Sequence, residues 1–348
     1  MNISIVAEPS FVDSTWGQAY RKGISQETSN QGFKLQDTPD STLLVIGSTL
    51  CWLQKTCATF QKKNRNIILL SPYLDTFSIP NTSSIGIDYQ DAMQTIIDYL
   101  REGHKTRTAL VGANPQSVSD MAKEYWFHRY FGKRNIFWNL GNIKTCCKAF
   151  LSSSSQFDSA ICTNDLVAME LFQMTDQIPM SLELVSFGDS ASASHSKPSL
   201  TSFACDYVLI GKLSVKMAMS LNRNKQLGRE AWTVKGKLEI RESTNNRPYL
   251  SKEHPTAGKN SSLSMNPYWI DVEITELQRR EKFVSALDSQ DLAILSGIQQ
   301  GQSYELIAEQ CGLSPNTVKY RLQRMKRLSG FTERRHLLYW ARALITLS

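Results

Sequence analysis

The chain contains 348 residues, of which 41% are hydrophobic, and its 39 basic and 32 acidic side chains give a formal net charge of +7. This length suits two domains of unequal size, each able to bury its own core. No stretch approaches the roughly 18 consecutive apolar residues of a membrane helix, and the N-terminus lacks the basic segment and apolar run of a secretory signal. We therefore expect a cytoplasmic protein without a membrane partner.

The cysteine and histidine positions argue against a metal site, a disulfide framework and an enzyme. The seven cysteines form no CxxC pair, and the five histidines lack metal-ligand spacing. The sequence also has no Gly-x-Ser-x-Gly motif and no glycine-rich phosphate loop. We expect no metal, no cofactor and no catalytic residues.

The N-terminal 243 residues alternate short apolar runs with amphipathic stretches. One such stretch, residues 16–31, places Trp16, Tyr20 and Ile24 on one helical face. This alternation predicts βαβ units, and hence an α/β fold with mainly parallel sheets that bind ligands at the carboxyl ends of their strands. The runs expected to form strands are residues 3–7, 42–46, 67–70, 109–111, 159–162 and 184–187.

A series of motifs follows in a specific order along this region. They include Ala160-Ile-Cys-Thr-Asn-Asp165 and Leu184-Val-Ser-Phe-Gly-Asp189, with further matches at residues 88–104, 109–112, 178–179, 200–201 and 238–243. Together they resemble the effector-binding domain of the lactose-repressor family, a two-lobed type I periplasmic-binding-protein fold around a ligand cleft. The resemblance implies a sensor over residues 1–243. In that family the DNA-binding helices normally precede the sensor, whereas this chain opens with the first predicted strand.

The resemblance also implies a set of cleft residues. Asn164 stands at the position of the family's ligand-binding asparagine, and Asp88 aligns with another cleft-facing polar position. Phe11 and Trp16 fall where the family often places an aromatic wall, which would stack on a flat ligand face. Packing within the hinge or lobe is the alternative for both rings. We expect Asp165 to cap the helix that it opens rather than to touch a ligand.

Two positions depart from the family. Lys123 stands where a ligand-gripping arginine is expected, and Gly188 replaces the first aspartate of a Phe-Asp-Asp motif, leaving Asp189. Sugar hydroxyls are usually held by bidentate arginine and paired carboxylates, whereas a lysine favours negative charge over hydroxyl geometry. The expected effector is therefore a sugar or an anionic sugar derivative, with Lys123 and Asp189 among its contacts.

Residues 244–272 are polar and rich in Asn, Ser, Lys and Pro, which predicts a linker. The following helix, residues 273–287, has apolar spacing at Ile274, Leu277 and Phe283. This helix either packs on a partner subunit or leads into the next domain, and the sequence leaves both alternatives open. We expect a helical DNA-binding domain over residues 273–348.

Within that domain, one short helix is predicted at residues 303–311. It begins with the capping residue Ser303, carries Leu306, Ile307 and Cys311 on roughly one face, and stops at Gly312. The tight turn that follows leads directly into another helix, so the two helices are expected to pack against each other.

The second helix has a natural N-cap at Ser314 and a proline at its first position. Val318, Leu322 and Met325 recur at i, i+4 and i+7 and form its core stripe, so the polar and basic face points outward. Two short helices joined by a tight turn form the helix-turn-helix pattern, in which the second helix enters the major groove of DNA.

The domain carries a series of motifs at residues 292–295, Gly301, residues 305–308, Ser314-Pro-Asn-Thr-Val-Lys319 and residues 337–341. Over about 60 residues these motifs resemble the LuxR-type (GerE-like) DNA-binding domain. The resemblance implies a four-helix domain with Lys319, Tyr320 and Gln323 at base-facing positions. Arg324, Lys326 and Arg327 would meet phosphates, which position a protein without reading sequence. The expected DNA-contacting set is Asn316, Thr317, Lys319, Tyr320, Gln323, Arg324, Lys326 and Arg327.

The net positive charge is confined to this end of the chain. From Gly312 onward there are eight basic residues and one acidic residue, whereas the preceding 311 residues carry 31 of each sign. Such an asymmetry is the expected footprint of polyanion binding. We expect a homodimeric regulator that binds double-stranded DNA and responds to a small-molecule effector.

Three other functions are alternatives to this one. A regulator with a degenerate cleft controlled by a protein partner remains open, and a solute-binding protein is disfavoured by the basic C-terminus and the missing signal. A phosphorylated receiver domain would need an acidic pair after its first strand and an aspartate ending the third, where this chain offers Glu8 and Gly47.

Overall fold

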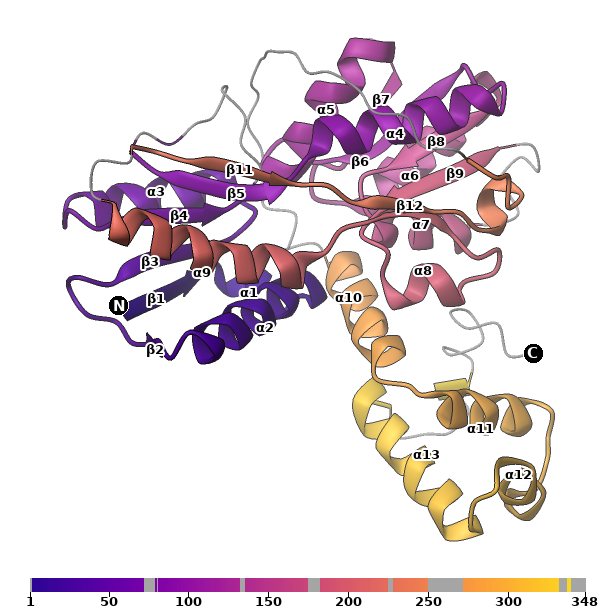
Figure 1. Ribbon diagram of the computed structural model, residues 1–348. Helices are drawn as coiled ribbons and strands as arrows, with labels where there is room; N and C mark the ends of the chain where they lie inside the picture. Colours follow the sequence, from indigo (N-terminus) through magenta and orange to yellow (C-terminus); the bar gives the residue numbers. More distant parts are fainter. Residues whose placement is uncertain are drawn as a thin grey trace.

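The structure is a computed structural model, and it describes residues 2–71, 79, 81–131, 135–174, 182–224, 228–249, 272–331 and 337–338. Two α/β lobes are followed by a small helical unit, which one helix connects to them (Figure 1). The predicted fold class, an α/β sensor with mainly parallel sheets plus an all-helical C-terminal unit, is confirmed. Among the helices described, none has the length and hydropathy needed to span a membrane.

The first lobe contains the strands β1 (Asn2–Ala7), β2 (Lys34–Leu35), β3 (Thr42–Ile46), β4 (Ile67–Leu70), β5 (Ser83–Ile87) and β11 (Ala231–Val234). They form a parallel sheet in the order β11-β5-β4-β3-β1-β2. Every residue of β3 and β4 is buried, which explains their apolar sequences. The helices of this lobe are α1 (Pro9–Val12), α2 (Thr15–Asn30), α3 (Leu50–Gln61) and α9 (Tyr207–Arg223).

Helices α2 and α9 approach each other closely through two glycines. A Cβ atom on Gly23 would lie 2.0 Å from the carbonyl oxygen of Val208, and one on Gly211 would lie 2.3 Å from the carbonyl oxygen of Tyr20. No larger residue fits at either point. This contact brings the rings of Tyr20 and Tyr207 together edge to face, with centroids 5.2 Å apart.

The second lobe contains the strands β6 (Thr108–Ala113), β7 (Ile136–Trp138), β8 (Ser159–Cys162), β9 (Glu183–Phe187), β10 (Thr201–Ala204) and β12 (Lys237–Glu239). Their order is β12-β10-β9-β8-β6-β7, and β12 runs antiparallel to β10 while the other neighbours are parallel. The helices of this lobe are α4 (Tyr89–Glu102), α5 (Val118–Phe131), α6 (Ile143–Leu151), α7 (Asp165–Phe172) and α8 (Ala191–His195), with 3-10 turns at Ser154–Gln156 and Glu242–Thr244.

The first residues of the predicted linker pack on the second lobe. The hydroxyl of Thr244 is buried, 2.6 Å from the hydroxyl of Tyr99 and 2.7 Å from that of Thr201. Arg247 forms an ion pair with Glu183. The rest of the predicted linker, residues 250–271, lies outside the described residues. The division into domains remains a prediction.

The helical unit is formed by α10 (Val272–Ser285), α11 (Ser289–Gln299), α12 (Tyr304–Cys311) and α13 (Pro315–Ser329). Ser303 and Ser314 cap α12 and α13 as predicted, and Gly312 ends α12 with a φ of +65°. The expected stripe on α13 is buried. On the face predicted for α12, Ile307 is buried, whereas Leu306 is 42% exposed. Of the expected fourth helix, residues 337 and 338 are described and helical.

Helix α10 contributes to two hydrophobic cores. Ile274 and Leu277, near its start, are buried in the core of the second lobe, and the helix contacts α6, α7 and α8. Phe283 and Val284, near its end, are buried among α11, α12 and α13. Of the two alternatives left by the sequence, the structure supports the helix that leads from the sensor into the next domain, packed on its own second lobe.

Candidate ligand pocket and nucleic-acid interface

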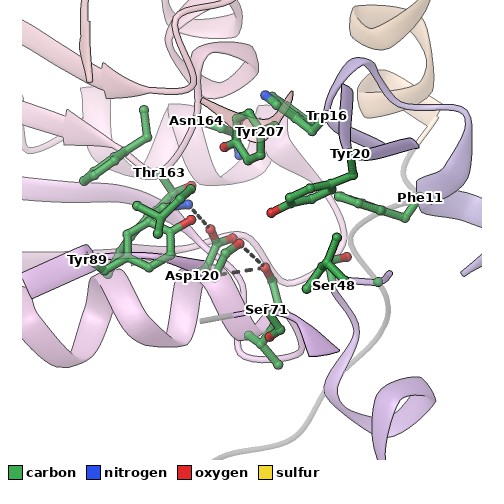
Figure 2. A pocket seen from close by; sticks show the side chains of 18 residues that line it. Phe11, Trp16, Tyr20, Ser48, Ser71, Tyr89, Asp120, Thr163, Asn164 and Tyr207 are labelled. Atoms are coloured by element: carbon green, nitrogen blue, oxygen red, sulfur yellow. Dashed lines mark hydrogen bonds and ion pairs between the residues drawn. The ribbon is translucent and has the colours of Figure 1, made fainter. Parts of the chain in front are cut away.

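A pocket lies between the two lobes, where the chain passes from one sheet to the other (Figure 2). It encloses about 690 Å³ of empty space, including the part open to solvent. Much of its lining follows the carboxyl ends of strands, as expected for parallel sheets. The lining residues are Phe11, Trp16, Tyr20, Gly47, Ser48, Leu70, Ser71, Ile87, Tyr89, Ser117, Val118, Ser119, Asp120, Lys123, Thr163, Asn164, Phe187 and Tyr207.

Aromatic side chains form two walls of this pocket. On one side the ring centroids of Phe11 and Tyr20 lie 6.4 Å apart, and Trp16 stands next to them (Figure 2). On the other side the rings of Tyr89 and Phe187 meet edge to face, 6.0 Å apart. Phe11 and Trp16 thus line the pocket as the sequence predicts, and their contact with a ligand remains a proposal.

Neutral hydroxyl groups supply most of the polar lining. Burial raises the pKa of Tyr20, Tyr89 and Tyr207 above the usual value, so their phenols stay protonated. A neutral phenol both donates and accepts hydrogen bonds. Further hydroxyls in the lining belong to Ser48, Ser71, Ser117, Ser119 and Thr163.

The two charged residues of the lining are paired with each other. Lys123 Nζ lies 2.9 Å from Asp120 Oδ1 on the same helix, and the side chains are only 5% and 4% exposed. Burial raises the pKa of Asp120, and the nearby Lys123 opposes that rise. The Lys123 ammonium also lies 5.2 Å and 5.3 Å from the ring centroids of Tyr89 and Phe187. Lys123 therefore lines the pocket, as expected, but with a counter-charge already in place.

Asn164 lines the pocket and begins helix α7. Its Oδ1 accepts a hydrogen bond from the backbone amide of Val167 at 3.2 Å, so Asn164 is the N-cap. The cap predicted for Asp165 is wrong by one residue. Binding of a ligand by Asn164 stays a proposal.

Asp165 has a different role behind the pocket wall. Its buried carboxylate accepts hydrogen bonds from the backbone amide of Ser190 at 2.6 Å and from the hydroxyl of Ser202 at 2.7 Å, together with one from the hydroxyl of Ser186. Burial raises the pKa of Asp165 to about 6, against these stabilising hydrogen bonds. The carboxylate therefore joins α7 to the start of α8.

The structure places Asp88 and Asp189 outside the described pocket lining, and contact of either residue with a ligand remains a prediction. Asp88 is the N-cap of α4, where Oδ1 accepts the amide of Asp91 at 3.0 Å and Oδ2 accepts the hydroxyl of Thr233 at 3.3 Å. Asp189 pairs with Arg241 at 2.6 Å. In both cases the carboxylate is engaged by nearby groups of the protein, and the resemblance alone could not reveal those partners.

Several lining residues were not singled out from the sequence, although signals for them existed. Ser48 and Ser71 follow β3 and β4 within two residues, so the rule for strand ends could have found them. Tyr20 lies on the predicted apolar face of α2. Asp120 stands three residues before Lys123, which is the spacing of a helical ion pair. Tyr89 and Tyr207 follow β5 and β10, and neither strand was predicted, so the rule for strand ends could not find them.

The outer face of α13 matches the expected DNA-facing side. Asn316, Lys319, Gln323 and Arg327 are exposed, and Tyr320 is 63% exposed. Two further members of the expected set, Thr317 and Lys326, are partly buried. The backbone amide of Thr317 also donates to the capping Ser314. Contact of this face with DNA remains a proposal.

Arg324, expected at a phosphate, is instead held by the protein. Its Nη1 lies 2.8 Å from the buried carboxylate of Asp291, and its Nη2 donates to the carbonyl oxygen of Ala286 at 2.7 Å. Arg321 pairs with the same Asp291 at 2.9 Å and with Asp288 at 2.8 Å. These two arginines fasten α13 to the start of α11, which is a structural role.

Two family models match the chain. Residues 97–244 match a periplasmic binding protein-like domain, and residues 287–328 match a winged helix-turn-helix DNA-binding domain. The chain thus combines a periplasmic-binding-protein-like domain with a C-terminal helix-turn-helix. The matching model is of the winged type, so the LuxR type expected from the sequence is not confirmed. No curated protein matches the chain.

Solved structures of transcription regulators share the fold of the two lobes. The regulator CcpA of Lactococcus lactis has a TM-score of 0.58 at 16% identity, with 70% of this chain and 100% of that chain covered. A complex of the transcriptional regulator CelR with cellobiose has a TM-score of 0.57 at 14% identity, with 70% of this chain and 84% of that chain covered. The lac repressor dimer bound to operator and the anti-inducer ONPF has a TM-score of 0.56 at 14% identity, with 70% of this chain and 81% of that chain covered. At these identities the likeness shows the fold, and none of these neighbours is an enzyme.

Proposed function

We propose that this protein is a cytoplasmic transcription regulator that binds double-stranded DNA through α13 and is controlled by a small molecule in the pocket between the lobes. The observation that carries the proposal is helix α10, which is shared by both parts. It packs on α7, which begins at the pocket wall, and on α8, and its other end completes the core of the helix-turn-helix unit.

A continuous set of contacts supports control of one part by the other. Asn164 lines the pocket, and its neighbour Asp165 accepts a hydrogen bond from Ser190, the N-cap of α8. The next two amides of α8 donate to the carboxylate of Glu281 on α10. A ligand that favours one arrangement of these elements over another would shift the position of the helix-turn-helix unit and so change its affinity for DNA. By thermodynamic linkage, bound DNA would change the affinity for the ligand by the same factor.

On DNA, Lys319, Tyr320 and Gln323 are proposed to face the bases, with Asn316 and Thr317 near the start of the helix. Lys326 and Arg327 are proposed to meet phosphates. We further propose a homodimer, because two readers would then bind neighbouring half-sites. Sugar is a natural first ligand to examine, since the CelR neighbour was solved with cellobiose.

The test uses the full-length protein and duplexes enriched by it from a random library. Anisotropy of a labelled duplex should show tight binding that weakens steeply with salt. Lys319→Ala should weaken binding, while Lys22→Ala, which removes an exposed lysine on α2, should not. Failure to enrich any duplex, or equal loss in both variants, would refute DNA binding by α13. DNA affinity that no pocket ligand changes would instead point to the degenerate cleft controlled by a protein partner.

A further inference from the structure

The charges around the pocket are satisfied within the protein. Lys123 and Asp120 neutralise each other in the lining at 2.9 Å. Behind Ser48, the buried carboxylate of Glu8 accepts that residue's backbone amide at 2.8 Å. Behind Asn164, the carboxylate of Asp165 accepts the three hydrogen bonds described above. The described lining therefore offers a ligand no uncompensated charge.

A charged ligand would have to break one of these arrangements. An anion that paired with Lys123 would leave Asp120 buried without its partner. A cation that paired with Asp120 would likewise leave Lys123 buried without a counter-charge. Breaking a buried ion pair is costly, because the remaining charge stays desolvated. Asp120 is also attached to Lys123 through one turn of helix and accepts the amide of Asn114 at 3.3 Å. An external ion thus competes with a partner that is always present.

The remaining surface suits a flat ring. Phe11, Trp16 and Tyr20 stand on one side of the pocket and Tyr89 on the other (Figure 2). The ring of Phe187, which also lines the pocket, packs edge to face against Tyr89. Aromatic rings favour stacked or edge-to-face contact with another ring. An aromatic ligand between these walls would bury both of its faces without needing a charge.

The polar groups of the lining are neutral and few in kind. They are hydroxyls and the amide of Asn164, whose oxygen already caps α7. Among the described lining residues there is no arginine, and the one carboxylate is paired. Proteins that bind sugars usually hold the many hydroxyls with arginine and carboxylate side chains, which are planar and charged. This lining therefore suits a ligand with one or two polar groups better than one covered with hydroxyls.

We propose that the pocket binds an uncharged aromatic ligand, with a single or fused ring that carries one or two amide, carbonyl or hydroxyl groups. This class replaces the anionic effector expected from Lys123. The inference rests on the proposed function only in taking this pocket as the sensory site, and the binding itself is measured without DNA.

The test compares isosteric ring compounds of different charge. Benzamide, benzoate and benzamidine, with 2-naphthamide and 2-naphthoate, are added to the full-length protein up to their solubility limits, beside glucose and cellobiose. Ligands that bind the folded state raise Tm by mass action. We expect the neutral amides to raise Tm by a few degrees and the charged isosteres to leave it unchanged. A larger rise with a carboxylate, an amidine or a sugar, or no rise with either amide, overturns the proposal.

Two variants locate and explain the selectivity. Asn164→Ser keeps an N-cap but removes the amide donors, and it should weaken amide binding. Asp120→Asn frees Lys123 and should let the pocket accept 2-naphthoate, whereas Asp40→Asn, at an exposed carboxylate, should behave as wild type. If Asp120→Asn does not fold, the wild-type series alone decides. Amide binding that leaves DNA affinity unchanged would uphold the ligand class and contradict ligand control.

Discussion

The carboxylate of Glu281 on α10 accepts a hydrogen bond from the backbone amide of Ser192, the second residue of α8, at 3.0 Å. Its other oxygen accepts the amide of Ala191, also at 3.0 Å, and Glu281 is only 3% exposed. A carboxylate at the first amides of a helix satisfies donors that have no partner within that helix. Glu281 therefore connects α10, the helix that leads into the helix-turn-helix unit, to α8 of the second lobe.

Replacing Glu281 by alanine should loosen this junction. Two backbone amides, one buried and one partly buried, would lose a charged acceptor, which we expect to lower the free energy of unfolding by about 2 kcal/mol. Hydrogen exchange at Ala191 and Ser192 should accelerate, and any effect of a pocket ligand on DNA affinity should shrink. Glu276→Ala is the matched control, because that acid on the same helix is more exposed and pairs with Arg279 and Arg280 rather than with the amides of α8. Equal exchange in both variants would contradict the role of Glu281.

Lys319 and Gln323 should determine which DNA sequence is bound. Both are exposed on the outer face of α13, and alanine at either position should cost roughly 1–3 kcal/mol at the base pair that the side chain contacts. The measurement is a repeated selection from a random library with each variant. Preferences identical to those of the wild type would argue against base reading by this helix.

Arg324 and Arg327 should respond differently, although both are basic residues of α13. Arg327→Ala should weaken binding to all duplexes alike and reduce the salt slope by about 1. Arg324→Ala should leave that slope unchanged and lower Tm, because Asp291 would lose a partner at 2.8 Å while remaining fully buried. Anisotropy titrations over a salt series, with a melting curve for each variant, separate the two roles. A reduced slope for Arg324→Ala would restore it to the DNA interface.

Much of the fold could be predicted because its central strands are apolar. The runs at residues 42–46 and 67–70 coincide with β3 and β4, which are buried on both faces. β5 was not predicted, since Ser83 and Ser84 give it no apolar run, yet both serines are buried. β11 was missed as well, because it joins the first sheet only after the chain has returned from the second lobe. Such strands depend on the tertiary structure rather than on local pattern.

The site could be predicted less completely than the fold. Resemblance placed Phe11, Trp16 and Asn164 at the pocket, where the structure also has them. It also named Asp88, which lies outside the described lining and caps α4, because a carboxylate at a helix start is as useful to the backbone as to a ligand. The partner of Lys123 is local in sequence, but its burial between Tyr89 and Phe187 depends on packing of distant segments.

Asp165 should make stability depend on pH in an unusual direction. Burial raises its pKa from 3.8 to about 6 in the folded protein, so the folded state holds this proton more tightly than the unfolded state does. The stability contributed by this group is therefore fully present below the unfolded pKa and is lost as pH rises through about 6. A shift of this size corresponds to roughly 3 kcal/mol.

The measurement is the free energy of unfolding of wild type and Asp165→Asn between pH 4 and pH 7. Because the variant cannot titrate at this position, the difference between the two proteins isolates Asp165 from the other carboxylates. The wild type should lose stability relative to Asp165→Asn as pH rises, by up to the same few kcal/mol. Asp40→Asn, at an exposed carboxylate, is the matched control substitution. If the wild type instead gains on Asp165→Asn above pH 5, the hydrogen bonds from Ser186, Ser190 and Ser202 outweigh the cost of burial, and the pKa of Asp165 is lowered.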